Sequence, residues 1–444
     1  MDIRSVAREV LQGALKESPD GAEVFCVSSS STTIEAKKQQ VDALEAACEQ
    51  GVGLRLLVKN RIGFAYSSSF DPDALKRLVT EALASANSSE PDSANCLPLL
   101  PSAYPEVSTS DPALMEVTEE QIVDWAVAME KAALERDPRI RAVRKSSVST
   151  GHGEKCIISS TGIDICVPYT VVSASLMAMA EEGGDSQSGW EFDYSRRAGR
   201  LDTRKVGVAA ADRALGLLGA RSVGSASVPV VLENSVTADF LGVLASSFSA
   251  DNVLKGKSLL AKREGSRIAS PLISIIDDGL MPDGIATSPA DDEGAPRMRC
   301  TLVEEGVLKG FLHDSYTARR TGAVSTGNAV RGGFKSVPSV GISNFFIEPG
   351  TVSLEELLDM EKGLFVTEAM GVHTANPISG DFSIGVSGFW VEKGKAVHPV
   401  RGMVIAGNLL EMMEKVEQIG NDLRFFGRIG APAVRIGRMS ISGK

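Results

Sequence analysis

The first part of the chain changes from a helical spacing of apolar side chains to a strict alternation. Residues 2–18 place their apolar side chains on one helical face, and the Pro-Asp-Gly sequence that follows should end this helix. Alternation with a period of two then predicts antiparallel strands in a meander, with one face buried and the other exposed. The alternating runs are 22–30, 32–38, 41–48, 51–59 and 62–68.

The next part of the chain predicts helices and further strands around a long polar loop. Asp71 and Pro72 predict the start of a helix to about residue 86, because an aspartate at this position can accept from the free amide groups of the first turn. Residues 87–111 are rich in serine, proline and asparagine and should form a surface loop. Helices are predicted at 118–136 and 202–218, strands at 140–149, 154–160 and 165–182, and a polar acidic stretch up to Tyr194.

A segment of small and polar residues, 219–227, is the predicted boundary between two domains. After it, residues 228–232 have the character of a buried strand and 235–248 that of a helix, and the rest is glycine-rich and dominated by strands. Helices and antiparallel strands occur in runs, so the predicted class is α+β and not a doubly wound parallel sheet. We expect an N-terminal domain, a meander with helices, over 1–220 and a glycine-rich, strand-dominated domain over 228–444.

Charge and composition exclude several functional classes. The 444 residues carry a formal net charge of -11 with a pI near 5.1, whereas binding to the nucleic-acid backbone requires clustered lysine and arginine. No stretch approaches the roughly 18 uninterrupted apolar residues of a membrane-spanning helix, and the N-terminus lacks the apolar segment of a signal peptide. We therefore expect a cytoplasmic protein that binds neither nucleic acid nor membrane.

The cysteines indicate neither a metal site nor a disulfide framework. None of them forms a Cys-x-x-Cys motif, and they are spread over predicted strands and loops. Reduced and mostly buried thiols are therefore the expected state. The six cysteines are Cys26, Cys48, Cys96, Cys156, Cys166 and Cys300.

The segment from residue 291 to 333 carries the most specific pattern in the chain. Alternating apolar residues flank Glu305 and Gly306, which predicts two strands joined by a tight turn, because glycine readily adopts the positive φ of a two-residue hairpin loop. An acidic loop with the sequence Asp-Asp-Glu precedes this hairpin at 291–293. Three neighbouring carboxylates could bind a hard cation, but the favoured interpretation is a solvated acidic turn.

Four polar side chains near glycine-rich loops are candidates for substrate binding. Asn328 offers both a donor and an acceptor, as a peptide backbone requires, and Arg331 can hold a carboxylate through two parallel hydrogen bonds. The alternative is structural, with Asn328 in a left-handed turn and Arg331 paired with a neighbouring acid. His373 and Asp381 precede or begin a glycine-studded strand and could line the same cleft, although a histidine satisfied within a turn is the commoner case.

Histidine usage argues against a zinc site. A zinc peptidase needs at least three protein ligands, commonly including two histidines on one helix face beside a catalytic glutamate. The four histidines, His152, His313, His373 and His398, lack this spacing, and none is followed by glutamate. We expect no metal ligand and no catalytic residue in this chain. The weakest alternative is an independent hydrolase that uses the acidic loop with His313 or His373.

Several motifs in a fixed order resemble the TldD/PmbA family, whose members were once called modulators of DNA gyrase. The resemblance covers most of the chain, is strongest from about Val228 onward, and is closest to the PmbA, or TldE, branch. The motifs are Asp-Asp-Glu-Gly-Ala-Pro at 291–296, Gly-Val-Leu-Lys-Gly-Phe-Leu at 306–312, Thr-Gly-Asn at 326–328, and the segment 376–408.

The resemblance also shows which residues are missing. In the TldD branch, a helix after the buried strand carries His-Glu-x-x-x-His, and a cysteine near the C-terminus completes the zinc site. The corresponding positions here are Gly242, Val243 and Ser247, and residues 421–430 contain no cysteine. Glycine and valine side chains have no donor atom, and a serine hydroxyl is a poor zinc ligand at neutral pH. These degenerate positions predict that the family's catalysis does not carry over to this chain.

The resemblance therefore implies a non-catalytic, TldE-like subunit of a cytosolic zinc metalloprotease that acts on unfolded or extended peptides. Its partner in a heterodimer would be a TldD-like chain that supplies the zinc, so no cofactor is expected in this chain. The alternative is a stand-alone peptide-binding or scaffold homodimer without peptidase activity, since two-fold dimers are the commonest assembly. A second chain carrying His-Glu-x-x-x-His in the same cell would favour the subunit hypothesis over the homodimer.

Overall fold

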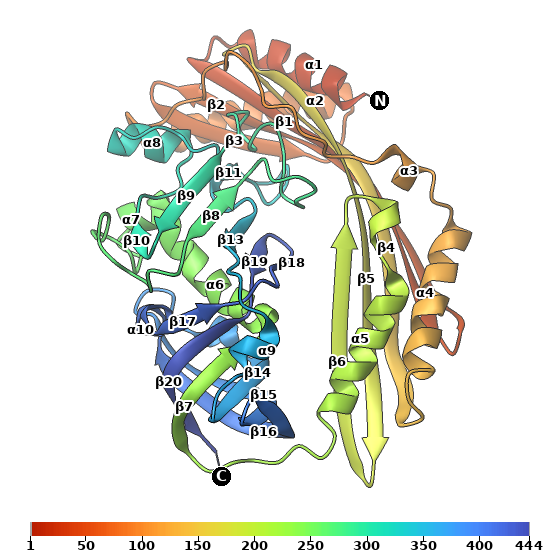
Figure 1. The fold of residues 1–444 in the computed structure, drawn as a ribbon. Coiled ribbons are helices and arrows are strands. Elements are labelled where there is room, and N and C mark those ends of the chain that lie inside the picture. Colours follow the sequence, from red (N-terminus) through yellow and green to blue (C-terminus); the bar gives the residue numbers. More distant parts are fainter. Residues whose placement is uncertain (1, 444) are drawn as a thin grey trace.

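The computed structural model describes residues 2–443, and a long curved sheet stands beside a body of shorter strands and helices (Figure 1). The long sheet has the strand order β3-β2-β1-β4-β5-β6, and all neighbouring strands in it are antiparallel. Its strands are β1 (Gly21–Lys37), β2 (Gln40–Val58), β3 (Arg61–Ser67), β4 (Ile140–Ser159), β5 (Asp164–Glu182) and β6 (Asp185–Ser195).

Several strands are longer than the sequence pattern indicates. The predicted runs 22–30 and 32–38 form the single strand β1, and the runs 41–48 and 51–59 form β2. The polar acidic stretch before Tyr194 is strand β6, which pairs with β5. Serine-rich and acidic segments weaken the side-chain alternation, but the backbone hydrogen bonds to neighbouring strands continue through them.

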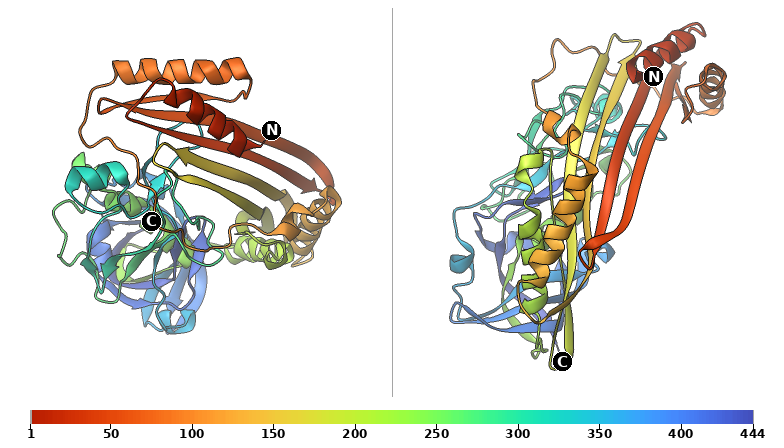
Figure 2. Two further views of the ribbon diagram at one scale, coloured as in Figure 1. Left: turned by 90° about the horizontal axis from the view of Figure 1, so that it is seen from above. Right: turned by 90° about the vertical axis from the view of Figure 1, so that its right-hand side faces the viewer.

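Four long helices cover one face of this sheet, two at each end (Figures 1 and 2). Helix α2 begins at Pro72 as predicted, but the side chain of Asp71 accepts a hydrogen bond from Ser69 and caps no helical amide, so the predicted side-chain cap is wrong. The helices are α1 (Ile3–Leu15) and α2 (Pro72–Ser88) at one end, and α4 (Glu119–Leu134) and α5 (Thr203–Gly216) at the other, with the short α3 (Pro112–Met115) and η1 (Ala198–Arg200) in the connections.

The uncovered face of the sheet points toward the second half of the chain. Val24 and Ile34 of β1 lie in the cores beneath the helices, and both are fully buried. Because side chains alternate along a strand, Glu23 and Phe25 point to the opposite face. There Phe25 packs in a small apolar cluster with Phe334 from the second half. The alternation thus places Glu23 and Phe25 of the first sheet against the glycine-rich loop that contains Arg331 and Phe334.

The second half contains two further six-stranded sheets and a core shared between them. The sheets have the orders β10-β9-β8-β13-β19-β18 and β16-β15-β14-β7-β20-β17. Helix α6 (Asn234–Ala245) contributes Phe240 to the core, which also includes Val230 and Phe345 from the two sheets. Residues 217–225 connect α5 to β7 along the bottom of Figure 1. Runs of antiparallel strands with separate helices confirm the α+β class.

The elements of the second half have the following bounds. The strands are β7 (Ala226–Leu232), β8 (Ile275–Asp278), β9 (Arg299–Glu304), β10 (Val307–Leu308), β11 (Ala329–Val330), β12 (Ser339–Val340), β13 (Phe345–Ile347), β14 (Lys362–Met370), β15 (Asp381–Glu392), β16 (Lys395–Asn408), β17 (Val416–Ile419), β18 (Arg424–Phe426), β19 (Ile429–Ala431) and β20 (Val434–Ser442). The remaining helices are η2 (Ser246–Phe248), α7 (Ala250–Leu254), α8 (Ser315–Thr321), α9 (Leu354–Leu357), η3 (Val372–Thr374) and α10 (Leu409–Glu414).

The predicted hairpin is present as β9 and β10. Glu305 and Gly306 form its turn, and both have positive φ angles, 47° and 78°. Two consecutive positive φ angles are the signature of the tight turn that fits the twist of paired strands. Among residues 2–443, no helix is both long and apolar enough to cross a bilayer.

Candidate functional site

The acidic loop before this hairpin lies in the interior, so the prediction of a solvated acidic turn is wrong. Asp291, Asp292 and Glu293 are 0%, 8% and 1% exposed. Asp291 holds the loop in shape, because its carboxylate accepts hydrogen bonds of 2.9 to 3.0 Å from the backbone N–H groups of Glu293, Ala295 and Ala329. Buried carboxylates require charged or hydrogen-bonding partners, and the first sheet supplies them.

Charged side chains of the first sheet neutralise the acidic loop. Lys155 of β4 lies 2.5 Å from Asp292, and Arg55 of β2 lies 3.4 Å from Glu293. Arg55 also forms an ion pair of 2.5 Å with Glu23 of β1. The contacts of Lys155 with Asp292 and of Arg55 with Glu293 join the two halves of the chain through charges that are largely shielded from water. Together with Arg331, described next, these residues form the buried ion network: Glu23, Arg55, Lys155, Asp292, Glu293 and Arg331.

Two of the predicted substrate-binding residues, Asn328 and Arg331, lie inside this interface. The amide of Asn328 donates a hydrogen bond of 3.0 Å to Asp277. The side chain of Arg331 is 1% exposed and forms an ion pair with Glu23. Both side chains therefore have internal partners in this conformation, and their role in peptide binding stays a prediction. The left-handed conformation considered for Asn328 belongs instead to Gly327, whose φ is 66°.

The ion pair between Lys155 and Asp292 should make the folded protein less stable at acid pH. Burial opposes the charge on Asp292, but Lys155 and Arg297 outweigh it and lower the pKa to about 2. A carboxyl group with a folded-state pKa below its unfolded value of about 3.9 contributes stability above pH 4, which is lost as the pH falls through 2.

The substitution Lys155→Met should therefore lower the free energy of unfolding by about 3 kcal/mol at pH 7, because it leaves a buried carboxylate without its nearest cation. The loss should be much smaller at pH 2.5, where protonation removes the charge in the variant. Urea unfolding of both proteins at the two pH values measures this difference. An equal loss at both values would contradict the assigned ion pair.

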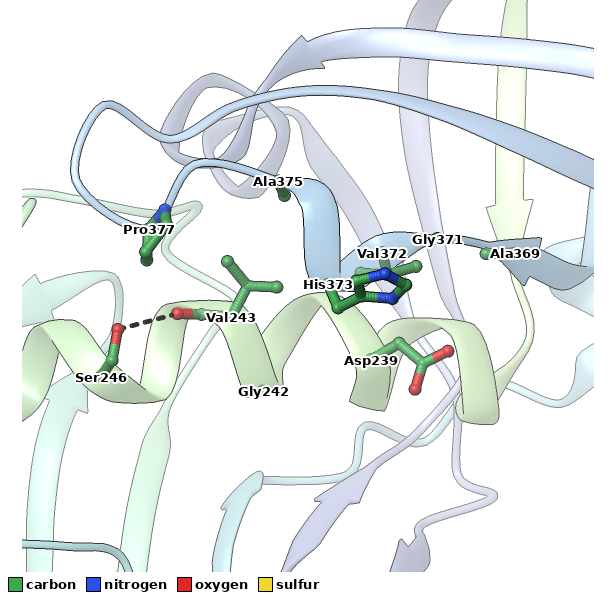
Figure 3. Close-up of a pocket in the computed structure, with 10 residues that line it drawn as sticks. All are labelled: Asp239, Gly242, Val243, Ser246, Ala369, Gly371, Val372, His373, Ala375 and Pro377. Carbon is green, nitrogen blue, oxygen red and sulfur yellow. Dashed lines mark hydrogen bonds between the residues drawn. The ribbon is translucent and has the colours of Figure 1, made fainter.

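A second feature, a pocket of about 540 Å³, lies beside helix α6 (Figure 3). The helix contributes one wall from residues spaced three or four apart, which share one helical face. The opposite wall comes from the end of β14 and from η3. The volume falls in the usual range for ligand-binding sites. The lining residues are Asp239, Gly242, Val243, Ser246, Ala369, Gly371, Val372, His373, Ala375 and Pro377.

The degenerate motif positions lie at this pocket, but they provide no metal-binding chemistry. Gly242 and Val243 line it without a donor atom, whereas Ser247 is 1% exposed and its hydroxyl donates to the carbonyl of Pro377 at 3.4 Å. A Cβ atom at Gly242 would lie 3.0 Å from the side chain of Ile429, which comes from the cysteine-free segment 421–430. An apolar residue therefore stands close to the position where a histidine side chain would begin.

The predicted site residue His373 lines the same pocket, and its ring faces the carboxylate of Asp239 (Figure 3). Asp239 was not among the predicted site residues. Its spacing contained the signal, because Asp239 precedes Gly242 and Val243 by three and four residues on one helix. Asp381 does not line the pocket. Its carboxylate accepts hydrogen bonds from Asn408 at 3.0 Å and from Ser379 at 2.8 Å at the start of β15.

The cysteines differ from the expectation of reduced thiols, because Cys156 and Cys166 form a disulfide. Strands β4 and β5 place these two residues directly opposite each other, so the turn between the strands brings them together. Glu154 lies nearby, and these three residues are the only cluster of potential metal ligands among residues 2–443. The cluster belongs to the first sheet and shares no residue with the α6 pocket.

Comparisons with known proteins agree along the whole length of the chain. Models of PmbA/TldA metallopeptidases match three successive segments: domain 1 over residues 22–86, the central domain over 113–218 and the C-terminal domain over 225–443. The chain is 30% identical to the metalloprotease PmbA of Escherichia coli O157:H7, with 99% of this chain and 97% of that protein covered.

Solved structures show the same fold. A candidate modulator of a DNA gyrase from Thermotoga maritima superposes with a TM-score of 0.91 at 26% identity, covering 99% of both chains. TldE from Thermococcus kodakarensis gives a TM-score of 0.91 at 24% identity, covering 99% of this chain and 100% of that one. The arrangement of the two halves is therefore common to proteins of distant sequence.

Proposed function

Because this chain belongs to the PmbA/TldD metallopeptidase family, we propose that it is the non-catalytic, TldE-like subunit of a zinc metalloprotease. A TldD-like partner would supply the zinc and the catalytic residues in the cytoplasm. This chain would help to enclose the cleft and to position unfolded or extended peptides. It would need no cofactor of its own.

The observation that carries this proposal is the composition of the α6 pocket. Zinc in a peptidase needs at least three donor side chains and a base close to the bound water. Gly242 and Val243 offer neither, and Ser247 is turned into the interior toward Pro377. The pocket keeps the size of a binding site while lacking the groups that cleave a peptide bond, which is the composition expected of a subunit that binds without reacting.

The outer edge of β2 supports the proposal of a partner. Residues 40–50 are exposed on both faces, and within residues 2–443 no strand pairs with their outer side, because β3 begins its pairing only at Val52. An exposed edge strand of this length is a ready site for pairing with another chain. Asp42, Glu45 and Glu49 give it a negative charge, so a TldD-like partner should present a strand with basic residues here.

Mixing the purified chain with a purified TldD-like chain tests the subunit role. Cleavage of an unfolded, fluorescently labelled peptide should be at least about tenfold faster in the mixture than with the TldD-like chain alone, because correct positioning of a substrate contributes far more than this to catalysis. Equal rates would rule out the subunit role.

A matched pair of variants locates the contact in the same assay. Leu44→Lys with Ala46→Lys places two positive charges on the β2 edge and should abolish co-purification and the rate increase. The control Ala84→Lys changes an exposed position of α2 and should leave both unchanged. If this chain instead forms a scaffold homodimer, sedimentation of the isolated chain would show a dimer in the absence of any TldD-like chain.

A further inference from the structure

The α6 pocket contains one charged group without a partner. Within residues 2–443, the Asp239 carboxylate makes no hydrogen bond or ion pair with another side chain. Asp239 is exposed to solvent, but desolvation beside the pocket walls still raises the pKa of its carboxyl group, and no nearby cation opposes this shift. A carboxylate in a partly enclosed pocket is stabilised when a cation binds beside it, because the cation supplies the missing opposite charge.

The groups around Asp239 define what kind of cation would fit. Val243, Val372, Ala375 and Pro377 form apolar walls, which suit a chain of methylene groups better than a small hydrated ion. The imidazole of His373 faces Asp239 across the pocket and adds a ring nitrogen that can accept a hydrogen bond (Figure 3). An elongated group with an apolar stem and a cationic end matches this combination of walls and acceptors.

We propose that the α6 pocket binds a lysine or arginine side chain of an extended peptide, with Asp239 as the anion and the apolar walls around the methylene stem. This inference deepens the proposed function and rests on it, because it assigns a preferred side chain to the peptides that the subunit positions. The pocket lies beside the helix that carries the degenerate positions Gly242 and Val243. In this chain, the place where the TldD branch binds zinc would therefore recognise a substrate side chain.

Peptide binding by the full-length chain tests this assignment. Two fluorescein-labelled unstructured peptides are compared, identical except that one carries a single lysine where the other carries norleucine, which has a similar stem and no charge. Fluorescence anisotropy should show the lysine peptide binding about fivefold more tightly, which is the upper range for an ion pair at a solvent-exposed carboxylate. Equal affinity for the two peptides would overturn the proposal.

Variants separate the pocket from the general acidity of the chain. Asp239→Asn should remove the preference for lysine and leave the affinity for the norleucine peptide unchanged. The control Asp251→Asn removes an equal charge from α7, where Asp251 pairs with Lys255 outside the pocket, and should keep the preference. A preference that survives Asp239→Asn, or is lost in Asp251→Asn, would contradict the assigned site.

The outcome is distinguishable from a failure of the proposed function. In the mixing assay, Asp239→Asn should slow cleavage of the lysine peptide and leave cleavage of the norleucine peptide as fast as with the unchanged chain. If the mixture cleaves both peptides equally fast with either version of the chain, the subunit role stands and the lysine pocket is wrong. If the chain never accelerates cleavage, the subunit role fails, while the binding measurements still decide the pocket.

Discussion

Replacing Glu23 with glutamine should lower the free energy of unfolding by about 3–5 kcal/mol, because it removes the shared anion of two buried cations. Glu23 is 0% exposed and pairs with both Arg55 and Arg331. Glutamine keeps the shape of the side chain but not its charge. Arg331 would then keep hydrogen bonds to carbonyl groups but would lose its only ion pair among residues 2–443.

Urea unfolding followed by tryptophan fluorescence measures this effect. The control Glu348→Gln breaks an exposed ion pair with Arg299, whose side chains are 44% and 49% exposed, and should cost less than about 1 kcal/mol. The double variant Glu23→Gln with Arg331→Met removes the cation that Glu23→Gln alone leaves without an ion pair, and it should recover part of the loss. A loss for Glu23→Gln no larger than that of the control would show that the buried ion network does not hold the two halves together.

The residue pattern correctly predicted two local features, the tight turn between β9 and β10 and the start of helix α2. The turn at Glu305 and Gly306 followed from two alternating runs around a glycine, and both residues have the positive φ angles that such a turn requires. The start of α2 at Pro72 followed from the proline itself. Both features depend only on residues that are close together in the sequence, so they can be predicted from the local residue pattern.

The burial of the acidic loop could not be predicted in the same way. Its neutralising residues come from strands far away in the sequence, and the ion pair between Glu23 and Arg331 joins residues 308 positions apart. Hydrophilic residues in a loop normally indicate that the loop is exposed to solvent. Here the loop is buried because the first sheet packs against the second half of the chain. The prediction of reduced thiols is wrong for Cys156 and Cys166, which lie opposite each other on the two strands of one hairpin and form a disulfide.

The candidate pocket was predicted in part. The resemblance placed Gly242 and Val243 on the helix that forms one wall, and His373 was a candidate by its position before the glycine-rich strand. Asp239 was not predicted, because it lies outside the motif positions and shares only a helical face with them. Asn328 and Arg331 were predicted near a cleft, but the structure gives their polar groups internal partners.

The isolated chain should neither hold zinc nor cleave peptides. The α6 pocket lacks the donor side chains of a zinc peptidase, and Ile429 stands close to Gly242, where a ligand would begin. Any zinc bound by reduced sulfur atoms would belong to the first sheet, and the variant Cys156→Ser with Cys166→Ser removes those atoms. When the TldD-like chain is added, peptide hydrolysis should appear with both the unchanged chain and the Cys156→Ser, Cys166→Ser variant.

Metal content and activity, measured on the same sample of the dialysed, isolated Cys156→Ser, Cys166→Ser chain, show whether this chain has a catalytic centre of its own. Elemental analysis should find zinc well below one atom per chain, and an unfolded labelled peptide should remain intact over hours with added zinc. Stoichiometric zinc together with peptide cleavage in the absence of any other protein would contradict the account, because the chain would then carry its own catalytic centre.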